Sequence, residues 1–98
     1  MRLDKEKIIK IINKHRKELE EKYKIKSIAL FGSYIKDEQT EQSDIDLLVE
    51  YTETVGLLHI AATENYLSDI LGVKADIVPK KSVRKELKDV IFNEAVQI

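Results

Sequence analysis

Three short apolar runs, separated by polar or helix-forming sequence, place the tightest constraint on the fold of this chain. They lie at residues 25–31, 44–51 and 73–78 and are rich in Ile, Leu, Val and Ala, which favours β-strands. The second run contains consecutive apolar residues at 47–49, as in a strand that is covered on both faces. We therefore predict a small mixed sheet of three main strands flanked by helices.

The segments around these runs have helical periodicity. Residues 4–23 carry an apolar stripe at helical spacing, and Asp4 can cap that helix. A second helix is expected over residues 55–71 with Gly72 as its C-terminal cap, and Ser82 is expected to cap the start of a last helix. The predicted order is helix, strand, short turn or helix, strand, helix, strand, helix, an α/β fold.

Length and composition limit the functional classes. The chain has 98 residues, no Cys and a formal net charge of -1. We expect one domain over residues 1–98, with no thiolate metal site and no bulk attraction to nucleic acid. Since there is no signal-peptide core and no apolar run of membrane-spanning length, we expect a cytoplasmic protein without a membrane segment.

Two carboxylates open the second strand. Asp44 and Asp46 are two residues apart, so on a strand they point to the same face, with Cα atoms roughly 7 Å apart. Adjacent anions are tolerated where a cation lies between them, and oxygen ligands favour Mg²⁺ or Mn²⁺. For an isolated pair of this kind, the alternative is that Asp44 caps a turn and Asp46 is simply exposed to solvent at the end of the strand.

Topology adds a third carboxylate. The second and third strands are joined through a helix and should run parallel, so Asp76 should approach Asp44 and Asp46. The first two strands can be antiparallel, which brings Gly32 and Ser33 to the same edge. A glycine there permits close approach of a ligand, and the following N–H groups and the Ser33 hydroxyl can bind phosphate.

These parts fit two-metal nucleotidyl transfer. We predict that Asp44 and Asp46 bind a pair of Mg²⁺ ions through the triphosphate of the nucleotide. Asp76 is predicted to hold the catalytic ion and to accept the proton of the acceptor hydroxyl. Pyrophosphate is the expected leaving group.

The segment with Gly-Ser, ten intervening residues and Asp-x-Asp reads GSYIKDEQTEQSDID. It resembles the signature of the DNA polymerase beta-like nucleotidyltransferases, and most of all their minimal members, the MNT antitoxins paired with HEPN toxins. The resemblance covers nearly the whole chain. It implies metal ligands at Asp44, Asp46 and Asp76 and nucleotide contacts at Gly32 and Ser33. It also implies transfer of AMP from ATP to a tyrosine of a cognate HEPN toxin, in a hetero-oligomer.

One segment departs from the family pattern. Members often continue Gly-Ser with x-Ala-Arg-Gly, where this chain has Tyr34, Ile35, Lys36 and Asp37. Lys36 can supply a positive charge to the nucleotide but not the bidentate fork of arginine. This departure leaves open a non-catalytic antitoxin that neutralises its partner by binding alone. An enzyme acting on RNA or on a small molecule ranks last, because the chain is short and nearly neutral.

Overall fold

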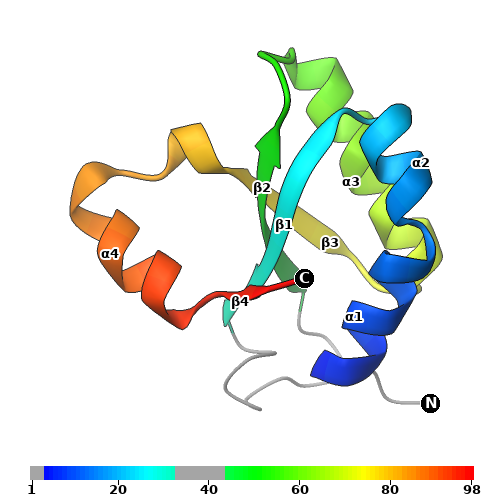
Figure 1. Cartoon of the computed structure of the whole chain (residues 1–98), viewed down its shortest axis with the longest axis horizontal. Coiled ribbons are helices and arrows are strands. Elements are labelled where there is room, and N and C mark those ends of the chain that lie inside the picture. Colours follow the sequence, from blue (N-terminus) through cyan, green and yellow to red (C-terminus); the bar gives the residue numbers. More distant parts are fainter. Residues whose placement is uncertain (1–3, 33–43) are drawn as a thin grey trace.

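A computed structural model of the chain describes residues 4–32 and 44–98 (Figure 1). The elements in chain order are α1 (Lys5–Lys14), α2 (Arg16–Glu21), β1 (Ile25–Phe31), β2 (Ile45–Tyr51), α3 (Leu57–Leu71), β3 (Ala75–Pro79), the 3₁₀ turn η2 (Lys80–Ser82), α4 (Lys85–Glu94) and β4 (Val96–Gln97). The α/β class and the mixed sheet are as predicted.

The sheet has the strand order β3-β2-β1-β4. β1 and β2 are antiparallel, and β2 and β3 are parallel, as the lengths of their connections predicted. The carboxyl end of β1 therefore lies beside the amino ends of β2 and β3. This arrangement places Gly32 at the same edge as the acidic residues.

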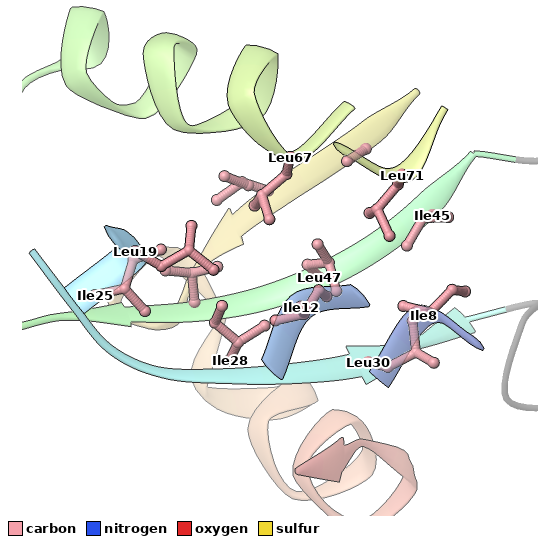
Figure 2. Packing of buried hydrophobic residues seen from close by; sticks show 13 residues of the cluster. Ile8, Ile12, Leu19, Ile25, Ile28, Leu30, Ile45, Leu47, Leu67 and Leu71 are labelled. Carbon is pink, nitrogen blue, oxygen red and sulfur yellow. The ribbon is translucent and has the colours of Figure 1, made fainter. Parts of the chain in front are cut away.

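Both faces of the sheet are covered (Figure 1): α1, α2 and α3 pack on one face and α4 lies across the other. On the first face, Ile12 from α1 and Leu67 from α3 meet Leu47 of β2, and all three are fully buried (Figure 2). On the other face, Leu48 packs in a smaller cluster with Ala29 and Val83. Adjacent residues of β2 thus enter two different cores, which explains its unbroken apolar run.

The predicted helix over residues 4–23 is in fact two helices. It breaks at His15, whose backbone has φ -106° and ψ 12° and whose N–H donates to Ile12 O instead of Ile11 O. The His15 ring Nδ1 lies 2.8 Å from the Ile11 carbonyl oxygen. The ring thus contacts a carbonyl that the continued helix would have used, and periodicity alone does not reveal such a break.

The C-terminal part differs from prediction in two ways. Ser82 is not a helix cap: it ends η2, and α4 begins at Lys85 because the extended Val83 inserts its side chain into the smaller core. A fourth strand, β4, pairs antiparallel with β1. The three main strands are correct, but a strand of two residues is too short to show alternation.

Other expectations have mixed outcomes. Gly72 has φ +74° and caps α3 as predicted. The turn or helix between β1 and β2 falls in residues 33–43, outside the described residues, and the single domain over residues 1–98 stays a prediction. Among the described residues, no helix is both long enough and apolar enough to cross a membrane.

Candidate active site

The amino ends of β2 and β3 bring the predicted carboxylates together. Their parallel register pairs Asp46 directly with Asp76, one position after the pair of Ile45 with Ala75. Asp44 precedes β2, and Ile45 between the two acids is fully buried. The alternation predicted from sequence therefore holds, with an apolar anchor between two partly exposed carboxylates.

Gly32 lies against Asp46. Phe31 is the cross-strand partner of Asp46, and Gly32 follows with φ +85°. A Cβ atom at Gly32 would be 2.5 Å from Asp46 Oδ2, inside any permitted contact distance. Glycine is favoured here, because the left-handed backbone is strained for other residues and a Cβ atom would force the Asp46 carboxylate to move.

Burial and neighbouring acids raise the pKa of Asp46 and of Asp76. For Asp46, the largest cause of the raised pKa is burial, followed by the negative charges of Asp76 and Asp44. For Asp76, burial again raises the pKa most, and a hydrogen bond with Asp44 and the charge of Asp44 add to it. Like charges held this close indicate a site where ionisation is costly and a cation or a proton is favoured.

Two residues that sequence reasoning missed surround Asp76. Lys74 Nζ lies 3.9 Å from Asp76 Oδ1 and opposes the rise of its pKa. Glu64, on α3, accepts a hydrogen bond from the Ile77 N–H and adds to the rise. An acid in the middle of a helix gave no signal in the sequence, because nothing local shows which strand it reaches.

The donor set suits a hard divalent cation. Asp44, Asp46 and Asp76 offer only oxygen atoms, and their mutual repulsion would be relieved by positive charge. In the described part of the chain, no three His, Cys, Asp or Glu side chains are close enough to hold a metal ion by themselves. Mg²⁺ does not require such a cage, because it is commonly held by one or two carboxylates together with substrate phosphates.

The described residues include only part of the predicted phosphate cradle. Ser33 and Lys36, and the departure at Ile35 and Asp37, lie outside the described residues. Gly32 is described and lies beside Asp46, at the sheet edge where the topology predicted it, and its contact with a nucleotide stays a prediction. The nucleotide contacts of Ser33 and Lys36 stay predictions.

A pocket of about 390 Å³ lies at the opposite end of the same strands. Its lining includes Val49 and Tyr51 from the end of β2 and Pro79, Lys80 and Lys81 from the end of β3 and the turn after it. Two of its charged side chains form an ion pair, with Lys80 Nζ 3.6 Å from Glu50 Oε1. Sequence reasoning did not predict this pocket.

The fold and the acidic edge define a nucleotidyltransferase. A family model described as "Nucleotidyltransferase domain" matches residues 12–98, and the chain belongs to this family. It is 37% identical over 93 residues to protein adenylyltransferase MntA of Thermococcus cleftensis, covering 95% of this chain and 94% of that one. A relative from Methanocaldococcus jannaschii, provisionally named as a protein adenylyltransferase, is 57% identical over 76 residues and 78% of each chain.

Solved structures share the fold. A toxin–antitoxin structure with AMP-PNP has a chain that superposes with a TM-score of 0.72 and 28% identity, over 97% of this chain and 72% of that one. A complex of a tri-AMPylated HEPN toxin of Shewanella oneidensis with an MNT antitoxin matches with a TM-score of 0.67 and 25% identity, over 92% and 70%. The resemblance to minimal nucleotidyltransferases is confirmed.

Proposed function

We propose that this chain is an antitoxin that acts as a protein adenylyltransferase, moving AMP from ATP to a tyrosine hydroxyl of a HEPN-type toxin. Support comes from the relatives named above and from the acidic edge of the sheet. The observation that carries the proposal is the register of Asp46 with Asp76, with Gly32 closed against Asp46. A cytoplasmic location, where ATP and Mg²⁺ are available, belongs to the same proposal.

In the proposed reaction the tyrosine oxygen forms a bond to the α-phosphorus of ATP. The bond from that phosphorus to the bridging oxygen of the β-phosphate breaks, and pyrophosphate leaves with the electron pair. Asp76 accepts the hydroxyl proton, a role that suits a carboxylate whose pKa is raised. The absence of a side chain at Gly32 leaves the Asp46 carboxylate in place beside it, and Ser33 and Lys36 would bind the phosphates.

Asp44, Asp46 and Asp76 would hold Mg²⁺, with a pair of ions proposed and Mn²⁺ as a substitute. When bound, the metal supplies positive charge that stabilises the phosphates as negative charge moves to the leaving group. The partly exposed position of the three acids lets them reach both the nucleotide and an incoming protein side chain.

The test combines purified protein, Mg²⁺, labelled ATP and a HEPN-type partner protein. We expect label on the partner with wild-type protein and none above background with Asp44→Asn. Transfer that survives Asp44→Asn would contradict the metal-ligand assignment. If Asp44→Asn lost transfer and still neutralised the toxin in cells, binding alone would account for the antitoxin effect.

A further inference from the structure

The outer edge of β3 is bound by side chains from α3. β3 lies at the edge of the sheet, and the Lys74 carbonyl just before it accepts from Ile45 N–H at 2.9 Å, so this side of the backbone faces β2. The N–H groups of Ala75 and Ile77 donate hydrogen bonds to side chains of α3. Ala75 N–H donates to Ser68 Oγ at 2.9 Å. Ile77 donates to Glu64 Oε2 at 3.1 Å.

The spacing of the two contacts matches on both elements. Glu64 and Ser68 are four residues apart and share one face of α3, while Ala75 and Ile77 are two apart and point the same way from the strand. The residue between the two bound amides is Asp76. Its backbone is thus fixed on one side by β2 and on the other by two side chains of α3.

This contact has an electrostatic cost, because Glu64 is a half-buried acid that adds to the negative charge around Asp76. A glutamine could accept the same hydrogen bond without that repulsion.

We propose that Glu64 and Ser68 are positioning residues for nucleotidyl transfer, and that they keep Asp76 at the depth and register where it faces Asp46. This inference rests on the proposed function of the acidic edge. A shift of about 1 Å in a reacting group can cost on the order of a hundredfold in rate, so loss of one anchor should be visible in kcat.

The test compares Glu64→Leu, Glu64→Gln and Ser68→Ala. Asp69→Leu is the matched control, since Asp69 is exposed on the same helix and its loss also removes one negative charge. For Glu64→Leu we expect kcat to fall about tenfold with the KM for ATP within about twofold. Glu64→Gln should restore kcat to within about threefold of wild type, because it keeps the acceptor for Ile77, and Ser68→Ala should lose about threefold.

A second readout does not depend on activity. Hydrogen exchange of the Ile77 amide should accelerate about tenfold in Glu64→Leu and stay near wild type in Glu64→Gln and Asp69→Leu. The Mn²⁺ concentration that broadens the Asp76 amide signal by half should be about threefold higher in Glu64→Leu than in Glu64→Gln. Both variants remove the same negative charge, so the difference reports the lost hydrogen bond.

The outcomes separate the inference from the proposed function. Inactive wild-type protein would contradict the proposed function, and the Mn²⁺ comparison would still decide whether Glu64 positions Asp76. Active wild type with equal kcat in Glu64→Leu and Asp69→Leu would overturn the inference, even with faster exchange at Ile77. In that case Glu64 would only cover the strand edge.

Discussion

The two ends of the β2–β3 strand pair differ in how their charges are arranged. At the amino end, Asp44, Asp46 and Asp76 lie close together, and Lys74 Nζ is 3.9 Å from Asp76 Oδ1. At the carboxyl end lies the 390 Å³ pocket, where Lys80 pairs with Glu50. Among the described residues, the carboxyl end has a pocket lined by both acidic and basic side chains, whereas the amino end has a cluster of three acids.

Under the proposed function, the reaction takes place at the acidic edge and not at the pocket. Ligands of open α/β sheets usually bind beyond the carboxyl ends of the strands. Here that rule applies to β1, whose antiparallel direction delivers Gly32 to the amino ends of β2 and β3. The cluster of partly buried acids, rather than pocket volume, marks the candidate active site.

The largest expected effect comes from neutralising one acid at each end. Asp46→Asn should lower kcat/KM for AMP transfer by about 10³-fold, because a charged ligand for the proposed cation is lost while the volume is kept. Glu50→Gln, the matched change at the pocket end, should alter it less than about twofold. Comparable losses in both variants would break the distinction between the two ends.

Two glycines with positive φ give the next comparison. Gly32→Ala places a methyl group 2.5 Å from Asp46 Oδ2, whereas Gly72 has no atom within 4 Å of its Cβ position. Both changes carry the left-handed backbone penalty of about 1 kcal/mol. Gly32→Ala should cost about a further 1 kcal/mol in unfolding free energy and lower transfer about a hundredfold.

Chemical denaturation and initial-rate assays of the two alanine variants measure this difference. Gly72→Ala should keep transfer within about twofold of wild type, since it lies away from the carboxylates. If Gly32→Ala behaved like Gly72→Ala in both assays, the close approach of Gly32 to Asp46 would have no functional meaning.

A smaller effect is expected in stability. Burial and the neighbouring acids raise the pKa of Asp46 and Asp76, so the folded protein binds more protons than the unfolded chain between the ordinary value of 3.8 and the raised values. Their contribution to stability therefore falls as pH rises through that window and stays low at neutral pH. Because solvent screens the partly exposed Asp46, Asp46→Asn should stabilise the fold by no more than about 0.5 kcal/mol at pH 7, or about 2–4 °C in Tm.

Thermal unfolding of wild type and Asp46→Asn between pH 3 and pH 8 checks this prediction as a difference between the two curves. Mg²⁺ should raise the Tm of wild type more than that of Asp46→Asn, because only the former has the full set of acids. If the Tm of wild type relative to Asp46→Asn rose with pH, the raised pKa of Asp46 would be contradicted.

The smallest effect belongs to the pocket end. Lys80→Met removes the partly exposed pair with Glu50 and should cost about 0.5 kcal/mol or less, with weaker dependence on salt than wild type. Transfer should be unchanged within about twofold. A loss of transfer above tenfold would give the pocket a role in the reaction and would contradict the restriction of the reaction to the acidic edge.

Sequence reasoning reached the parts of the site that depend on strand patterns. Alternation placed Asp44 and Asp46 around the buried Ile45, and connection lengths predicted the parallel pairing that puts Asp76 beside Asp46. Gly72 was recognised as a cap because a left-handed residue must follow α3. Local patterns and topology rules were sufficient for these features.

Features that depend on distant partners were not predictable. The break at His15, the short β4 and the extended Val83 depend on contacts with segments far along the chain or on a single side chain. Glu64 and Ser68 read only as polar positions of a helix, and their role becomes visible once β3 lies beside α3. Hydrogen bonds between distant residues leave no periodic trace in a sequence.

The most direct test of the acidic edge as a cation and nucleotide site is a Mn²⁺ titration, followed by amide NMR, in the presence of a non-hydrolysable ATP analogue. We expect selective broadening of the Gly32, Asp46 and Asp76 signals at the lowest Mn²⁺ concentrations. Signals of Thr54 and Lys81 at the pocket end should persist. Broadening that begins at Thr54 and Lys81, or that spares Asp46 and Asp76, would contradict the assignment of the active site.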